Sequence, residues 1–219
     1  MTIVQLHVWR IRPRSVPAMF WSMAVDGRRI RRSADFVKLL GTGRASDFRV
    51  NSADLTRWAA LVVSEHGTRP PMRGAVASCT LTLEPISTRG TWSKQSPFVP
   101  KKFQKSDTNP IAVLTRARLR PRQAAAFWKA IDPVARTLEG QEGLITAFGV
   151  GEAPVGFQGT VSVWRSQADV VRFAYRRPEH AAVVERTARQ RWYAEELFAR
   201  FRVLDVGGDR EVIGWRDGQ

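Results

Sequence analysis

Apolar residues alternate with polar ones, or form short runs rich in valine, isoleucine and leucine, at intervals along the whole chain. Alternation is typical of a strand with one buried face, because successive side chains point to opposite faces of a sheet. The stretches with this pattern are Ile3–Ile11, Phe36–Leu40, Leu55–Ser64, Thr80–Ile86, Ile111–Leu119, Leu144–Gly149, Gln158–Trp164 and Phe201–Val206. We predict a strand in each, and a strand-end turn at Gly41-Thr42-Gly43 and at Gly149-Val150-Gly151.

Apolar residues at helical spacing separate several of these strands and predict helices. Several of the helices begin at proline, which suits a first turn because its missing N–H has no partner there. The predicted helices run from Pro13 and Pro17 to about Arg31, from Pro70 through Val76, and over Arg122–Leu138, Gln167–Tyr175 and Pro178–Arg200. The order of elements in the first half is therefore β-α-β-β-α-β, and the second half repeats it.

Short motifs recur 107 or 108 residues apart and support a repeat. They are Arg12-Pro13-Arg14 with Arg120-Pro121-Arg122, Phe20-Trp21 with Phe127-Trp128, the two glycine pairs, and Arg69-Pro70 with Arg177-Pro178. A β-α-β-β-α-β unit is the ferredoxin-like motif. We therefore predict an α+β fold of tandem ferredoxin-like repeats, of the dimeric α/β-barrel type within one chain. Its parts are an N-terminal repeat (1–87), a basic, proline-containing connection (88–108) and a C-terminal repeat (109–219).

The charge of the chain is unusual: 35 Lys and Arg against 20 Asp and Glu give a formal net charge of +15. Such a balance attracts polyanions or anionic lipid, and a solvated arginine-rich surface is the open alternative. The single cysteine, Cys79, excludes an internal disulfide and a cysteine metal cage. Because the sequence shows neither a long apolar span nor a signal peptide, we expect a cytoplasmic protein.

The two copies differ at one chemically telling position, where Met72 in the first corresponds to His180 in the second. His180 lies in the first turn of the helix predicted from Pro178. It lies beside an apolar stripe formed by Ala181, Val184, Ala188 and Trp192. A neutral imidazole can be an axial ligand of haem iron, whereas the sequence lacks the paired ligands that zinc or non-haem iron needs. A surface or capping role for His180 stays open.

Aromatic residues concentrate in the second half, where they either fill a core or line an apolar pocket for a flat cofactor and an apolar substrate. The candidate cofactor contacts are His180, Phe148, Trp164, Phe173 and Val184. Arg116 and Arg118 share one strand face and are the candidate catalytic residues. Facing inward, they would pair with carboxylates such as haem propionates; facing solvent, they would not. The sequence contains no Ser-His-Asp order, Walker loop or Rossmann fingerprint.

Several longer motifs together resemble the spheroidene monooxygenase family of carotenoid biosynthesis. They are the stretches 109–117, 149–154 and 192–201, with Arg120-Pro121, Phe127-Trp128, Arg89-Gly90-Thr91-Trp92-Ser93, Pro97-Phe98 and His180-Ala181. The resemblance covers most of the chain and is densest from Arg89 to Leu204.

The resemblance implies a monooxygenase that contains haem b and uses O2. Family members hydroxylate an unactivated carbon of an acyclic carotenoid, and a second round at that carbon gives a ketone. The fold and the helix-borne histidine are also similar to those of aldoxime dehydratases and chlorite dismutases, whose proximal histidine lies in the C-terminal unit. The resemblance thus implies His180 as iron ligand, an external electron donor such as a ferredoxin, and a distal face lined by aromatics with Arg116 or Arg118.

Two other functions stay open beside this one. One is a haem enzyme acting on a nitrogen–oxygen substrate, like the aldoxime dehydratases. The other is a basic nucleic-acid-binding protein without enzymatic activity; the leading interpretation expects no nucleic acid, because the basic-aromatic signature of RNA-recognition sheets is missing. The positive charge further predicts docking of an acidic donor or peripheral contact with an anionic membrane, and a homodimer is an additional expectation.

Overall fold

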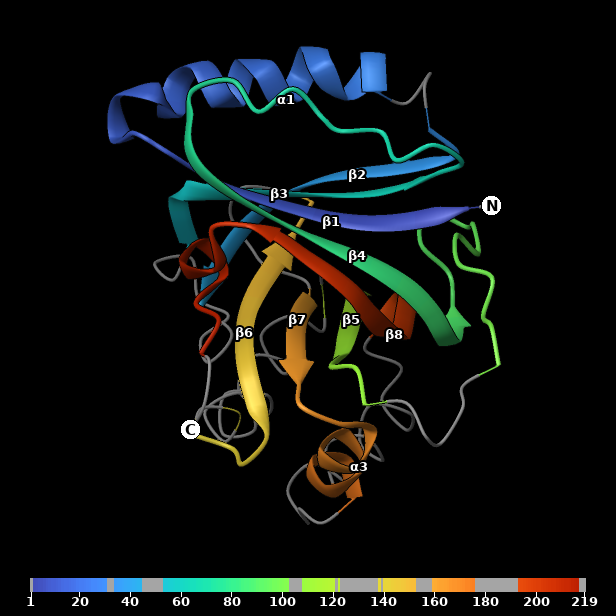
Figure 1. The fold of residues 1–219 in the computed structure, drawn as a ribbon. Coiled ribbons are helices and arrows are strands. Elements are labelled where there is room, and N and C mark those ends of the chain that lie inside the picture. Colours follow the sequence, from blue (N-terminus) through green and yellow to red (C-terminus); the bar gives the residue numbers. More distant parts are fainter. Residues whose placement is uncertain are drawn as a thin grey trace.

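The computed structural model describes residues 2–30, 34–44, 53–102, 108–120, 122, 138, 140–152, 159–175 and 193–216. Strands dominate this part of the chain (Figure 1). They are β1 (Ile3–Ile11), β2 (Phe36–Arg44), β3 (Ala53–Ser64), β4 (Ala75–Gly90), β5 (Ile111–Leu119), β6 (Leu144–Gly151), β7 (Gly159–Trp164) and β8 (Tyr193–Gly208). The helices are α1 (Val16–Ile30) and α3 (Gln167–Tyr175), with 3-10 turns η1 (Pro13–Ser15) and η4 (Arg210–Ile213).

The eight strands close one antiparallel barrel in the order β1-β3-β2-β6-β7-β5-β8-β4. The first half of the chain supplies β4-β1-β3-β2 and the second half supplies β8-β5-β7-β6, so both halves arrange their four strands in the same way. Two joints connect the halves: β2 pairs with β6, and β4 pairs with β8 over most of their length. The barrel that the sequence predicts is therefore confirmed, while the relation of the halves as repeats stays a prediction.

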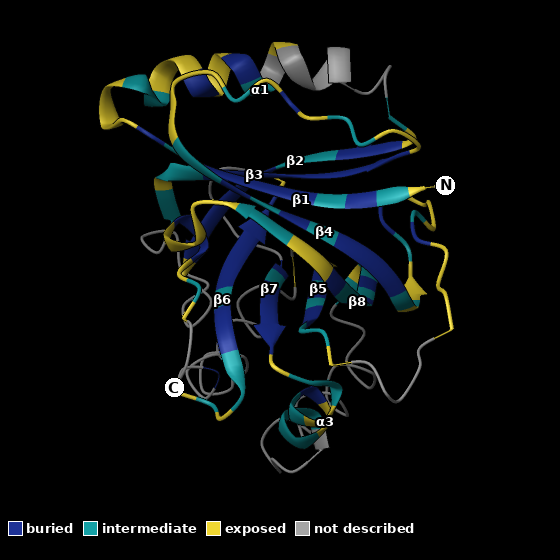
Figure 2. Ribbon diagram, in the orientation of Figure 1, coloured by how far each residue is buried: buried dark blue, intermediate teal, exposed yellow. Residues whose placement is uncertain are grey.

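The barrel interior is a packed core. Inward-facing residues alternate along every strand, as closure of a sheet requires, and the strands are correspondingly buried (Figure 2). Leu6, Leu61, Leu83, Leu114 and Phe201 converge from five strands and leave little space between them. The part of the interior lined by these described residues is consequently filled by side chains of the chain itself.

The two helices lie on opposite sides of this barrel (Figure 1). Helix α1 covers the outer face of the first-half sheet, where Met19 packs with Trp9 and Trp58 in a second apolar cluster. Helix α3 lies against the outer face of the second-half sheet, where Val170 and Phe173 pack with Trp164. Each sheet half thus has its own apolar layer outside the common core.

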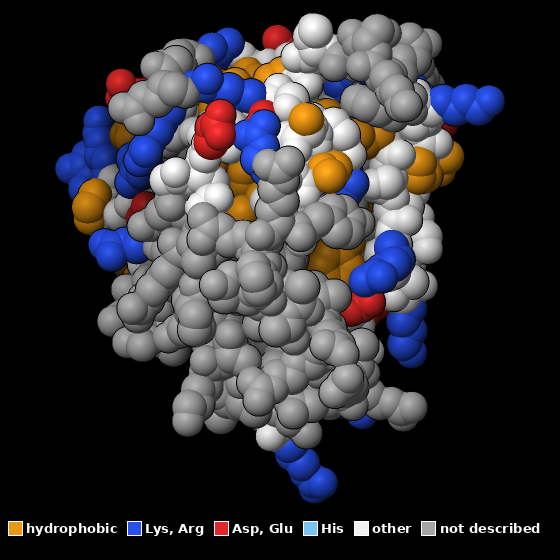
Figure 3. Space-filling model, turned by 90° about the horizontal axis from the view of Figure 1, so that it is seen from below, with side chains coloured by type: hydrophobic (Ala, Val, Ile, Leu, Met, Phe, Trp, Pro, Cys, Tyr) orange, Lys and Arg blue, Asp and Glu red, His pale blue; other side chains and the backbone are white. Residues whose placement is uncertain are grey.

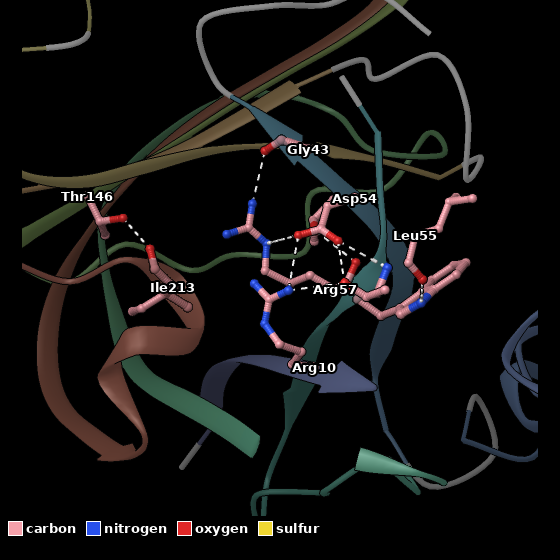
Figure 4. Close-up of polar contacts among 10 residues, drawn as sticks. Arg10, Gly43, Asp54, Leu55, Arg57, Thr146 and Ile213 are labelled. Atoms are coloured by element: carbon pink, nitrogen blue, oxygen red, sulfur yellow. Dashed lines mark hydrogen bonds and ion pairs between the residues drawn. The ribbon is translucent and has the colours of Figure 1, made fainter. Parts of the chain in front are cut away.

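Polar contacts fix the irregular parts of the barrel (Figure 4). Asp54 accepts hydrogen bonds from the backbone N–H and hydroxyl of Thr56, and its carboxylate lies 3.5 Å from the Arg10 guanidinium. Arg57 donates to the Gly43 carbonyl at 3.1 Å, beside the register shift between β2 and β3. The Thr146 hydroxyl donates to the Ile213 carbonyl and ties η4 to β6. These side-chain contacts stabilise the strand ends, where the regular backbone hydrogen bonds between strands are interrupted.

Three sequence-based predictions are wrong in the described residues. The glycine pairs are not turns: Gly41 and Gly43 lie in β2, Gly149 and Gly151 lie in β6, and the two segments pair with each other at a joint of the barrel. Pairing on both edges thus overrides the local tendency of glycine to end a strand.

The other two errors concern helices. The short helix predicted from Pro70 is absent: residues 67–72 are neither helix nor strand, and β4 begins at Ala75. The helix predicted to reach Arg200 is wrong from Tyr193 onward, because β8 begins there and pairs with β4 and β5. The predicted helix Arg122–Leu138, apart from its end residues, lies outside the described residues.

The predicted connection over 88–108 begins inside a strand, since β4 continues to Gly90. Its described part is anchored on the barrel. Trp92 and Phe98 are buried in the main core, and the Phe98 ring lies 4.9 Å from that of Phe201 in an edge-on contact. The segment after β4 is therefore a part of the packed structure.

Candidate functional site

The outer face of the second-half sheet carries small and polar side chains at its centre, beside the apolar residues of the α3 cluster. Val161 and Val163 point into the barrel core. Because successive side chains of a strand point to opposite faces, Thr160 and Ser162 face outward. The same alternation turns outward a set contributed by β5 and β6, namely Thr115, Ala117, Ala147 and Gly149. Thr115 and Thr160 are direct cross-strand partners at the centre of this face.

The corresponding face of the first half is filled by indoles. Trp9 lies 108 residues before Ala117, and it pairs across the strands with Trp58. Both tryptophans are almost completely buried under α1, where the Phe20 ring meets Trp58 edge-on at 5.3 Å. In the second half, Ala117 stands where the first half has Trp9. The strand residues at this position therefore fill less of the space outside the sheet.

Helix α3 forms a rigid apolar wall at one edge of this face. The Trp164 indole N–H donates to the Ser162 hydroxyl at 2.9 Å, and its ring lies 5.1 Å from that of Phe173. The Ser166 hydroxyl accepts the backbone N–H of Asp169 and donates to the Asp169 carboxylate, which caps the start of α3. Figure 3 shows the molecule from this side, with basic side chains around its periphery.

The predicted cofactor contacts do not all lie together. Trp164 and Phe173 are neighbours on the outer face. Phe148 points into the barrel core, where the Arg57 guanidinium lies 5.3 Å from its ring. A ligand on the outer face therefore meets Trp164 and Phe173 but is separated from Phe148 by the sheet. His180 and Val184 lie outside the described residues.

The two predicted catalytic arginines have different surroundings. Arg118 is exposed, whereas the Arg116 side chain is only 5% exposed and lies at one mouth of the barrel. Arg116 donates to Glu195 at 2.5 Å and to Glu152 at 2.7 Å, and its guanidinium lies 5.4 Å from the Trp92 ring. Lys38 completes the group with a bond to Glu152 at 2.7 Å. We call Lys38, Arg116, Glu152 and Glu195 the mouth cluster.

Hydrogen bonds keep both carboxylates of the mouth cluster ionised. Burial alone would raise the pKa of Glu195, but the backbone N–H of Lys94 and the Arg116 guanidinium outweigh it and lower the pKa to about 2. The pKa of Glu152 is likewise lowered: burial opposes its ionisation, and bonds from Lys38 and Arg116 favour it more. The positive charge of Arg116 is therefore matched by protein carboxylates inside the barrel mouth, on the opposite face from Trp164.

The sequence left open whether Arg116 faces inward or towards solvent, and it did not identify the partners that hold the side chain inward. Glu195, Leu197 and Ala199 alternate inward along β8, a signal that the mistaken helix concealed. Lys38 and Glu152 continue the inward alternation of β2 and β6. Within the described ranges, no group of three or more histidine, cysteine or acidic side chains is placed to hold a metal ion.

His7, in β1, is a buried histidine. Its Nδ1 lies 3.0 Å from the Thr80 hydroxyl. Burial lowers the pKa of His7 to about 4, so the ring is neutral at neutral pH. Burial also raises the pKa of the Cys79 thiol to about 11, which leaves it protonated and unreactive.

Comparison with known proteins gives no matching family model. Curated relatives do match. The spheroidene monooxygenase of Rubrivivax gelatinosus is 33% identical over 187 residues, which is 80% of this chain and 71% of that protein. The chain belongs to the spheroidene monooxygenase family. The enzyme of Rhodobacter capsulatus is 34% identical over 135 residues, 61% of this chain and 56% of the relative. For that relative the match spans only about half its length.

Solved structures relate the fold of this family member to one other enzyme class. A crystal structure of an aldoxime dehydratase superposes with a TM-score of 0.55 at 10% identity, over 93% of this chain and 81% of that one. At this identity the likeness shows a shared fold only. Among the described residues, no helix combines the length and apolar character needed to cross a membrane.

Proposed function

We propose that the chain is a haem-dependent monooxygenase that hydroxylates, and in a second round ketonates, an apolar substrate such as an acyclic carotenoid. The observation that carries this proposal is the 33% identity to a spheroidene monooxygenase over 80% of the chain. An external donor such as a ferredoxin would supply the electrons. The formal charge of +15 suits an acidic donor, because opposite charges accelerate encounter.

The proposed haem site is the outer face of the second-half sheet, with His180 as the proximal ligand to the iron of haem b. The described residues fit a flat ring there. Ala117, Ala147 and Gly149 contribute little bulk to this face, and Leu138, Trp164 and Phe173 form an apolar wall beside them. Haem bound at this face would supply the activation of O2. We further propose that the halves are ferredoxin-like repeats, of which only the second gained a ligand at the Met72/His180 position.

The residues of the chain then have distinct tasks. Trp164 and Phe173 exclude water and contact an apolar ligand, and the bond from Trp164 to Ser162 fixes the orientation of the indole. Arg116 is a positioning residue in this proposal, because the mouth cluster joins the ends of β2, β5, β6 and β8. A fixed backbone keeps the outward side chains of β5 and β6 in one plane.

An absorption spectrum of the purified protein after reconstitution with haemin tests the haem and its ligand. We expect a Soret band, and we expect His180→Ala to abolish it. His66→Ala is the matched control, since the side chain of His66 is 93% exposed and lies in a loop. A wild-type protein that stays colourless, or a His180→Ala variant with an unchanged spectrum, would refute the site.

Product analysis tests the reaction. With haem, an electron donor and an acyclic carotenoid, we expect hydroxylated and then ketonated product in the presence of O2, and none without it. Turnover of an aldoxime under anaerobic conditions, with no oxygen-dependent product, would instead support dehydration. Haem-free protein that retains nucleic acid at moderate salt would support the nucleic-acid-binding alternative.

A further inference from the structure

In its described part, from Val16 to Val25, helix α1 carries apolar side chains on both of its faces. Its inner face packs on the barrel, with Met19 buried and Val16 and Met23 partly buried against the tryptophan cluster. Its outer face carries Trp21, which is 75% exposed, and Val25, which is 50% exposed. A surface helix of a globular protein normally turns polar residues outward. The outer face of α1 therefore carries apolar groups that the barrel does not need for its own packing.

Helical spacing gathers these outward groups into one stripe. Pro17, Ala18, Trp21 and Val25 follow one another at intervals of one, three and four residues, and all four are exposed. Phe20, at the side of the stripe, is 40% exposed while its ring touches Trp58. Together these side chains form the largest exposed apolar group on any described helix, which we call the α1 stripe.

Positive charge lies beside the start of the α1 stripe. Between residues 12 and 25 the sequence has two arginines and no acidic residue. Arg12 and Arg14 are exposed directly before the helix. The segment before β4 adds two more exposed arginines, Arg69 and Arg73. It approaches the start of α1 at Gly74, where a Cβ atom would lie 3.4 Å from the Ser15 hydroxyl.

We propose that the α1 stripe docks the protein onto an anionic lipid bilayer. Tryptophan favours the boundary between headgroups and acyl chains, because its ring is apolar while its N–H is polar. A helix lying flat on this boundary buries its apolar face, and arginines at its ends bind anionic headgroups. The exposed Trp21, the exposed apolar face of α1 and the neighbouring arginines together match the surface of an anionic bilayer.

A second copy of the chain fits the stripe less well. A symmetric contact through α1 would bring together two copies of a chain that carries +15, with Arg12 and Arg14 exposed beside the contact surface. Like charges at such short range oppose association. The proposal does not depend on haem or on the reaction, because it rests only on the outer face of α1. Docking through α1 would leave α3, on the opposite side of the barrel, facing away from the membrane (Figure 1).

The test is flotation of the purified full chain with vesicles. We expect binding to phosphatidylcholine mixed with phosphatidylglycerol, weaker binding at high salt, and little binding to phosphatidylcholine alone. The double variant Trp21→Ser/Val25→Ser should reduce the partition onto anionic vesicles by about tenfold or more, because it removes the apolar contribution. Its matched control is Val99→Ser, which alters a 78% exposed valine outside α1.

The charge contribution has its own pair of variants. Arg14→Glu should weaken binding to anionic vesicles by about tenfold, and Lys102→Glu makes the same change of charge at an exposed site outside α1. Both variants should keep the wild-type circular dichroism spectrum, since both side chains are exposed. Equal loss in the two charge variants would overturn the proposal, because it would indicate attraction by net charge alone.

Two further outcomes would also overturn it. One is wild-type protein that does not bind anionic vesicles at low salt. The other is a Trp21→Ser/Val25→Ser variant that binds vesicles as the wild type does but changes from dimer to monomer in light scattering, which would assign the α1 stripe to a second copy.

Discussion

Replacing Arg116 by methionine tests the physical account of the mouth cluster most directly. The Arg116 and Glu195 side chains are only 5% and 7% exposed, and their atoms lie 2.5 Å apart. Methionine keeps much of the side-chain volume but leaves Glu195 as a buried carboxylate with only neutral donors. Removing one partner of a buried ion pair costs about 3–5 kcal/mol.

The pKa of Glu195 gives an independent figure of the same size. A folded-state pKa of about 2 against an ordinary 4.5 corresponds to a stabilisation of about 3 kcal/mol at neutral pH. Since the folded pKa is the lower one, this stabilisation is complete above pH 4.5 and is lost as the pH falls toward 2. In the Arg116→Met variant the pKa of Glu195 rises, so acidification lowers the free energy of unfolding of the variant less than that of the wild type.

Urea unfolding at neutral pH and near pH 3 measures both quantities. We expect Arg116→Met to lower the free energy of unfolding by about 3–5 kcal/mol at neutral pH, a fall in Tm of roughly 10 °C, and by clearly less at the acidic pH. Arg118→Met is the control two residues along the same strand; because Arg118 is exposed, its effect should stay within about 0.5 kcal/mol. A loss below about 1 kcal/mol at neutral pH, or an equal loss at both pH values, would refute this account.

Three further predictions follow from other sites. Because burial lowers the pKa of His7 to about 4, the free energy of unfolding of the wild type should fall by up to about 3 kcal/mol between pH 6.5 and 4. A His7→Asn variant whose free energy of unfolding falls as steeply in that window would contradict this prediction. Gly90→Ala should cost about 2–4 kcal/mol in urea unfolding, since Gly90 has a φ of 90° and a Cβ atom would lie 2.1 Å from the Glu196 carbonyl oxygen; Gly207→Ala, whose Cβ would meet only a side-chain oxygen at 3.7 Å, should be nearly neutral. Phe148→Leu should destabilise the core by about 1–2 kcal/mol without reducing haemin uptake, whereas Ala117→Trp should block uptake by copying Trp9; spectra that show the reverse order would place the ligand inside the barrel.

The sequence predicts most strands of this barrel because each has a clear alternation of its own. It fails where contacts from distant segments decide the structure. The stretch from Ala194 to Leu197 contains alanine, two glutamates and leucine, all good helix formers, yet it pairs with β5, and Leu197 also pairs with β4. Likewise, the sequence left open whether Arg116 faces inward, because its partners come from the end of β6 and from β8, which no local pattern connects to β5.

Strand register determines which aromatic side chains of the second half lie in the core and which lie on the outer face. Phe148 pairs with Val161 and shares its inward direction, while Trp164, three residues beyond Val161 on β7, points outward. Because the side-chain direction alternates with every residue, a shift of one position in either strand would move its aromatic residue to the other face of the sheet. The inward Phe148 and Val150 specify the register of β6, whose Gly151 pairs with Gly41 where the two halves meet. The register of β6 and β7 therefore determines which side chains of the second half lie outside the barrel and, in our proposal, contact the cofactor.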